Sequence, residues 1–112
     1  MKWLALFSQT GSEIANISDK INIKPTTILT DNLDITKHDK RITRFQYWNI
    51  KTNTYQQKLD YYRELFKDYD VITLHGWLNI IPKEICREFK IYNGHPGLIN
   101  VYPELKGKDP QV

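Results

Sequence analysis

The sequence predicts an α/β fold, a Rossmann-like and mostly parallel sheet with helices on both faces. Short apolar runs of strand length alternate along the chain with segments in which apolar residues recur at helical spacing. The strand-like runs are apolar throughout, as in strands that are buried on both faces. A length of 112 residues suffices for one domain with a modest core.

The first predicted unit is a strand followed by a turn and a helix. Residues 3–7 form a continuous apolar run, and residues 8–13 supply a glycine and small hydroxyl side chains for a turn. Three isoleucines then recur at helical spacing: Ile14, Ile17 and Ile21. Ser12 is the expected N-cap of this helix.

The middle of the chain predicts a second strand over residues 26–29. The polar residues 33–51 that follow are expected to be irregular, apart from a short strand within residues 42–48. The clearest helix covers residues 53–69. Its apolar stripe consists of Tyr55, Leu59, Tyr62, Leu65, Phe66 and Tyr69.

The remaining elements continue the alternation. Asn53 and Gln56 have the spacing of a capping pair at the start of the long helix. Two more strands are expected over residues 71–74 and 91–93, separated by a short helix that begins at Pro82. The repeated order of strand and helix therefore fits a single α/β domain.

Composition and charge exclude several classes of protein. The net charge is +3, and Lys and Arg are spread along the chain without a polybasic run, so nucleic acid is not an expected partner. The apolar run of residues 3–7 is too short for a signal peptide or a membrane span. Because Cys86 is the single cysteine, an internal disulfide is excluded, and we expect a cytoplasmic protein. We expect Cys86 itself to pack inside a helix. Cysteines and histidines at metal-ligand spacing are lacking, so no metal is implied.

The most informative motif lies near the end of the sequence, in Ile91-Tyr92-Asn93-Gly94-His95-Pro96-Gly97-Leu98. In a strand, Asn93 and His95 would point to the same side, because residues two apart share a face. Open α/β sheets bind ligands where their strands end, so this polar pair is a candidate site. On their own, the two residues are equally typical turn formers at the end of a strand.

This segment resembles the active-site segment of formyltransferases that use 10-formyltetrahydrofolate, with the signature Asn-x-His-Pro, a small residue and Leu. Later residues extend the similarity: Tyr102-Pro103, Lys106-Gly107 and Pro110-Gln111. The family includes the phosphoribosylglycinamide, methionyl-tRNA and nucleotide-sugar N-formyltransferases, and this chain looks most like the sugar enzymes. The resemblance implies that Asn93 and His95 are catalytic.

Two further segments are similar to the same family. Residues 74–82 resemble the loop that holds the folate pterin ring, which implies binding by Trp77, Leu78, Asn79, Ile80 and Ile81. Residues 8–12 resemble the first loop, which binds substrate phosphate in the glycinamide enzymes, and this implies that Gly11 and Ser12 bind substrate. Two structural alternatives stay open: the first loop could be a helix cap alone, and the apolar side chains of the second could simply cover the end of the sheet.

The chain also departs from the family pattern. Glu13 stands where the glycinamide enzymes usually carry Asn, which argues against that acceptor. The family's third catalytic residue is an Asp in a later strand-loop, and we expect residues 1–112 to be a partial N-terminal catalytic domain, truncated before the last strands. Asp109 is the only aspartate after His95 in this sequence, and it is better explained as a solvated loop residue.

The expected function is transfer of a formyl group from 10-formyltetrahydrofolate to a primary amine of a small, nucleotide-linked acceptor. Asn93 would donate to the developing oxyanion, and His95 would supply charge and a proton. The alternatives are a catalytically incomplete remnant that binds folate or nucleotide, and a plain nucleotide-binding domain. No membrane partner is expected, and a homo-oligomer is left open.

Overall fold

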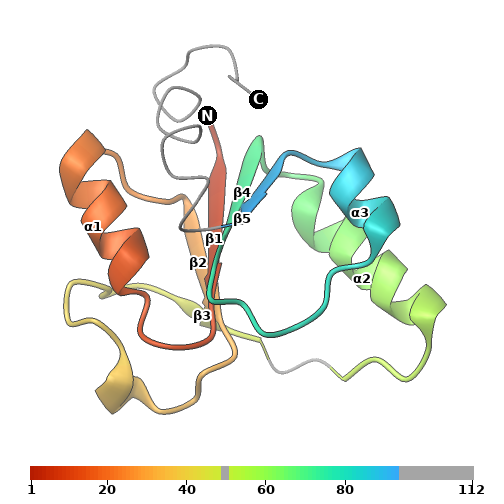
Figure 1. The fold of residues 1–112 in the computed structure, drawn as a ribbon, viewed down its shortest axis with the longest axis horizontal. Coiled ribbons are helices and arrows are strands. Elements are labelled where there is room, and N and C mark those ends of the chain that lie inside the picture. Colours follow the sequence, from red (N-terminus) through yellow and green to blue (C-terminus); the bar gives the residue numbers. More distant parts are fainter. Residues whose placement is uncertain (49–50, 94–112) are drawn as a thin grey trace.

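The computed structural model describes residues 1–48 and 51–93. Five strands form one sheet in the order β3-β2-β1-β4-β5, and every pairing is parallel (Figure 1). The strands are β1 (Trp3–Phe7), β2 (Thr27–Thr30), β3 (Gln46–Tyr47), β4 (Val71–His75) and β5 (Ile91–Asn93). The predicted α/β class and parallel sheet are therefore confirmed.

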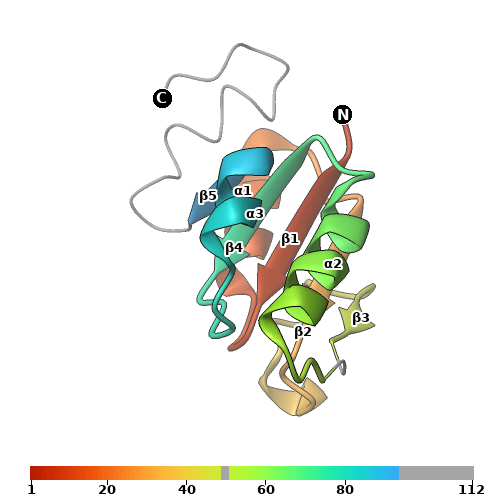
Figure 2. The ribbon, with the colours of Figure 1, turned by 90° about the vertical axis from the view of Figure 1, so that its right-hand side faces the viewer.

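Helices cover both faces of the sheet. α1 (Ser12–Ile21) lies on one face, whereas α2 (Tyr55–Phe66) and α3 (Lys83–Glu88) lie together on the other (Figures 1 and 2). A short 3₁₀ helix, η1 (Ile35–Lys37), interrupts the long connection between β2 and β3. This two-sided cover explains why the strand sequences are apolar without alternation.

Alternate residues of β1 belong to two separate cores. Trp3, Ala5 and Phe7 pack with the isoleucines of α1, whereas Leu4 and Leu6 pack with Leu59, Tyr62 and Phe66 of α2 and with Ile85 of α3. All five β1 side chains are buried. Each large side chain buried in this way contributes roughly 1.5–3 kcal/mol relative to exposure. The central strand therefore joins the two layers.

The start of α2 differs by one residue from the predicted capping pair of Asn53 and Gln56. Thr54 is the N-cap: its Oγ1 accepts a hydrogen bond from the Gln57 backbone N–H at 3.1 Å. The Gln57 side-chain oxygen accepts in return from the backbone N–H groups of Thr54 at 3.2 Å and Asn53 at 2.8 Å. A capping box thus satisfies donors that the first turn would otherwise leave unpaired.

Two predicted core positions are exposed. Tyr55 begins α2 with 56% of its surface exposed, and its hydroxyl donates a hydrogen bond to Glu84 Oε1 on α3 at 2.6 Å. Cys86 is also exposed, contrary to the prediction that it packs inside its helix. α3 is only one and a half turns long and buries Ile85 alone, so the next residue points outward.

We predict that Thr54→Ala lowers the free energy of unfolding by about 1 kcal/mol, because the mutation removes the N-cap acceptor of α2. Urea denaturation followed by circular dichroism measures this change. Thr52→Ala, two residues earlier, is the control and should be within about 0.5 kcal/mol of the wild type. Equal effects of the two variants would contradict the role of the capping box.

Candidate active site

The sheet has a topological switch point where β1 and β4 end side by side. The chain leaves β1 through α1 on one face and arrives at β4 from α2 on the other, so the crossovers diverge between these two strands (Figure 1). Parallel α/β sheets bind ligands at such a switch point, outside the carboxyl ends of the strands. The predicted site residues that the structure describes lie at this end of the sheet, in or next to the segments that follow β1 and β4, and at the last residue of β5.

Hydrogen bonds tie the loops at this edge to one another. They join the Leu78 N–H to Ser8 Oγ at 2.9 Å, Asn32 Nδ2 to the Gln9 carbonyl at 2.6 Å, Asn79 Nδ2 to Asp31 Oδ2 at 2.9 Å, and the Asp39 N–H to the Thr10 carbonyl at 2.7 Å. The loops after β1, β2 and β4 therefore form one connected rim. Asn79, one of the residues predicted to bind folate, is part of this rim.

Gly11 has a structural role in the first loop. Its φ of +74° is in the left-handed region, and a Cβ at this position would lie 2.3 Å from Ile42 Cδ1. Gly11, rather than the expected Ser12, is the N-cap residue of α1, and it makes no side-chain capping bond. The Ser12 hydroxyl lies 3.0 Å from Thr10 Oγ1 and also contacts the carboxylate of Asp39.

A buried network that sequence reasoning missed lies directly beneath this loop. His75 Nδ1 lies 2.5 Å from Glu13 Oε1, and His75 Nε2 lies 2.7 Å from Thr73 Oγ1, which also accepts from Trp3 Nε1 at 2.8 Å. Both ring nitrogens of His75, the Thr73 hydroxyl and the Trp3 indole N–H are satisfied when the imidazole carries its proton at Nδ1 and the Thr73 hydroxyl donates to Nε2. The His75 side chain is 2% exposed and that of Glu13 is 27% exposed.

Two carboxylates therefore stand at the first turn of α1. Glu13 belongs to that turn, and Asp39 contacts Ser12 from the long β2–β3 connection. Hydrogen bonds from the Arg41 side chain and backbone N–H hold the pKa of Asp39 far below its ordinary value, with a further contribution from the Ser12 hydroxyl. The positive end of the helix dipole is thus already matched by negative charge from the protein itself.

The loop after β4 contains both packed and exposed apolar side chains. Trp77 is half-buried: its Nε1 lies 3.4 Å from the Tyr62 hydroxyl, and its ring meets Trp48 edge to face at a centroid distance of 5.4 Å. Ile81 also packs against the α2 core. Leu78 and Ile80, in contrast, are 72% and 79% exposed. Part of this loop therefore covers the end of the sheet, and part presents an apolar surface to solvent.

Asn93 is the last residue of β5 and is exposed. Its partner in register is Leu74 of β4, so it lies at the same edge as His75 and the loop that follows. Its predicted catalytic partner, His95, lies outside the described residues, as do Asp109 and the later motif residues Tyr102 and Lys106. The convergence of the Asn93 and His95 side chains stays a prediction.

His38 is a buried histidine in the connection between β2 and β3. Its Nε2 lies 2.8 Å from the Asn32 carbonyl, and its ring packs edge to face against Phe7 and Phe45. Among residues 1–48 and 51–93 there is no group of three or more His, Cys, Asp or Glu side chains that could hold a metal ion. No helix in the same residues is long and apolar enough to cross a membrane.

Comparisons with known proteins confirm the fold expected from the resemblance. No family model and no curated protein matches the sequence. The structure is similar to phosphoribosylglycinamide formyltransferases from Streptococcus pneumoniae TIGR4 (TM-score 0.60, 16% identity, 86% of this chain and 57% of that one) and Anaplasma phagocytophilum (TM-score 0.55, 18% identity, 83% and 48%). Glycinamide ribonucleotide transformylase 1 from Symbiobacterium toebii is also similar (TM-score 0.56, 10% identity, 83% and 50%). The chain has the formyltransferase fold and spans about half the length of these proteins.

We predict that Glu13→Ala lowers the free energy of unfolding by about 1–3 kcal/mol, because it removes the hydrogen-bond acceptor of the buried His75 Nδ1. Glu13→Gln, which keeps a side-chain oxygen there, should lose less. Urea denaturation measures both changes. Glu64→Ala is the control, since its ion pair with Lys67 is exposed on α2 and contributes little. A loss no greater than that of the control would show that the network is not formed.

We predict a pH-dependent effect for Asp39→Asn. The folded-state pKa of Asp39 lies below its unfolded value of about 3.9, so the carboxylate stabilises the fold above that pH and this stabilisation is lost as the pH falls below it. The variant should therefore be less stable than the wild type near pH 6, and the gap should narrow towards about pH 2–3. Urea denaturation at the two pH values provides the measurement, and a pH-independent gap would contradict the assignment.

Proposed function

We propose that this chain forms part of an enzyme that transfers a formyl group from 10-formyltetrahydrofolate to a primary amine. The observation that carries this proposal is the position of Asn93, which ends β5 at the carboxyl edge of a sheet that superposes on three formyltransferases. The Asn-x-His-Pro motif begins at that residue. A loop with exposed apolar side chains follows the neighbouring strand, β4.

The proposed chemistry is attack of an amine on a formyl carbon. Bound 10-formyltetrahydrofolate supplies the formyl group and the leaving nitrogen. The Asn93 side-chain amide donates a hydrogen bond to the formyl oxygen as negative charge develops there, and one such donor accelerates a reaction by roughly 10²–10³. His95 donates the proton that the leaving nitrogen requires, a task suited to a group with an ordinary pKa of about 6.5, and the attacking amine gives up one proton to water as the new C–N bond forms.

The loop from Trp77 to Ile81 would hold the pteridine ring. Leu78 and Ile80 have large exposed apolar surfaces that a flat ring could cover, while the half-buried Trp77 anchors the loop to the α2 core. Asn79 is already bonded to Asp31, so its side chain would hold the loop in shape. Ligand sites of this kind combine apolar walls with a few placed polar groups, and the residues present fit that description.

The two carboxylates at the first turn of α1 limit which part of an acceptor can bind there. A phosphate monoester bound at Gly11 and Ser12 would approach the carboxylates of Glu13 and Asp39 and would be repelled by them. A neutral or positively charged part of the acceptor is better suited to this position. We therefore favour an acceptor that presents its amine or its sugar hydroxyls, and not a terminal phosphate, to the first turn of α1.

We predict that Asn93→Asp lowers turnover by about 10²–10³-fold with a much smaller change in KM, because the change removes the amide donor at nearly constant shape. Release of tetrahydrofolate in the presence of a panel of primary amines provides the assay, with His95→Ala as a second inactive variant. Asn53→Ala, an exposed position before α2, is the control and should retain full activity.

The same assay distinguishes the alternatives. Folate binding without turnover with any amine would favour the catalytically incomplete remnant. Nucleotide binding without folate binding would favour a plain nucleotide-binding domain. Wild-type turnover by Asn93→Asp would contradict the role proposed for the amide.

A further inference from the structure

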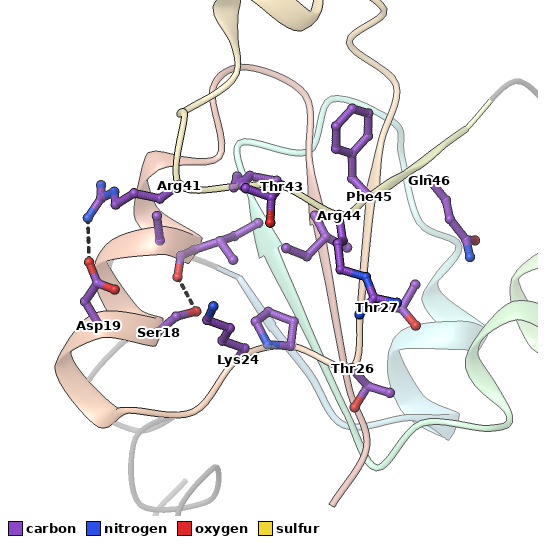
Figure 3. A pocket seen from close by; sticks show the side chains of 15 residues that line it. Ser18, Asp19, Lys24, Thr26, Thr27, Arg41, Thr43, Arg44, Phe45 and Gln46 are labelled. Atoms are coloured by element: carbon purple, nitrogen blue, oxygen red, sulfur yellow. Dashed lines mark hydrogen bonds and ion pairs between the residues drawn. The ribbon is translucent and has the colours of Figure 1, made fainter.

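A groove of about 870 Å³ lies on the α1 face of the sheet, away from the candidate active site (Figure 3). It is bounded by α1, by the start of β2 and by the segment of residues 41–46. None of the residues predicted to bind folate or acceptor lines it. A cavity of this volume accommodates a molecule of metabolite size.

The groove carries positive charge that the described part of the chain does not neutralise. Lys24, Arg41 and Arg44 line it, against the single carboxylate of Asp19. Arg41 is fully paired, since its guanidinium lies 2.9 Å from Asp19 Oδ2 and 2.8 Å from Asp39 Oδ2. Within residues 1–48 and 51–93, Lys24 and Arg44 have no ion-pair partner. Two uncompensated cations therefore share one concave surface, which strengthens its attraction for anions.

These two cations come from different segments. Figure 3 shows Arg44 extending from the segment 41–46 toward Thr27 on β2, while Lys24 comes from the loop between α1 and β2. The planar guanidinium of Arg44 offers a pair of parallel donors that matches two oxygens of a phosphate. Lys24 adds a compact second charge. The hydroxyl of Thr43, which is exposed on the groove wall, provides a further donor.

The floor between the cations is apolar. Ile14 and Ile42 belong to the α1-side core, and the partly buried Ile28 of β2 packs against them. All three line the groove. Because Ile14 and Ile42 are buried, the apolar surface left for a ligand is that of the partly buried Ile28 and Phe45, which both line the groove. An organic phosphate would pair with the cations and cover this surface, whereas an ion without a carbon skeleton would leave it uncovered.

We propose that this groove binds a small organic phosphate, with its phosphate group held by Arg44 and Lys24 and its carbon skeleton lying on Ile28 and Phe45. The site is separate from the proposed formyl-transfer site and does not depend on it. A nucleotide and a sugar phosphate share the required chemistry, and the experiment distinguishes them.

Isothermal titration of the protein with uridine 5′-monophosphate, glucose 6-phosphate, uridine and inorganic phosphate tests the proposal. At least one organic phosphate should bind more tightly than inorganic phosphate and than uridine. The double variant Lys24→Gln/Arg44→Gln should weaken this binding at least about tenfold, because it removes two charge-assisted contacts. The control Lys83→Gln/Arg87→Gln removes the same charge from exposed positions on α3, on the opposite face, and should bind within about twofold of the wild type.

Amide chemical shifts provide a second readout of location. Saturation with the tighter ligand should move the resonances of Thr26 and Thr43 and leave those of Leu78 and Asn93 unchanged. No binding of either organic phosphate, equal weakening by both double variants, or equal affinity for inorganic phosphate would overturn the proposal. Tighter binding of a single-stranded oligonucleotide through the same two cations would overturn it as well, in favour of a nucleic-acid surface.

Discussion

Burial of β1 on both of its faces is the constraint on which the rest of this structure depends. Trp3, Ala5 and Phe7 belong to the α1 layer, while Leu4 and Leu6 belong to the layer of α2 and α3. Residues paired in register share a face of the sheet, so β4 is divided between the same two layers as β1. Val71 accordingly belongs to the α1 layer, and Ile72 belongs to the layer of α2 and α3. A slip of one residue would exchange the two faces of a strand, and this is why the register is strongly specified.

The register of β1 and β4 also builds the candidate site. Phe7 pairs with His75, which places the histidine on the α1 face, next to the first turn of that helix. Glu13 then meets it across 62 residues of sequence. This contact gives the candidate site a buried polar network and leaves the partly exposed carboxylate of Glu13 at the first turn of α1. This carboxylate, in turn, is the physical reason to favour an acceptor that does not present a terminal phosphate there.

The sequence predicted the elements of the fold well because their signals are local. A continuous apolar run such as residues 3–7 indicates a strand with both faces buried, and the stripe in α2 requires one buried side. One error arose where neighbouring residues satisfied the same rule: Asn53 and Thr54 both suit an N-cap, and the reciprocal hydrogen bonds between Thr54 and Gln57 select Thr54. The site was less predictable, since the pairing of Glu13 with His75 follows from strand register, which no local pattern specifies.

The central claim is that the carboxyl edge of this sheet is built for acyl transfer, and a crystal structure with a stable analogue of 10-formyltetrahydrofolate tests it most directly. The account predicts that the pteridine ring lies against Leu78 and Ile80. It also predicts that the Asn93 side-chain nitrogen lies within about 3 Å of the oxygen that represents the formyl group. A ligand bound at another face of the sheet, or an Asn93 side chain directed away from that oxygen, would contradict the account.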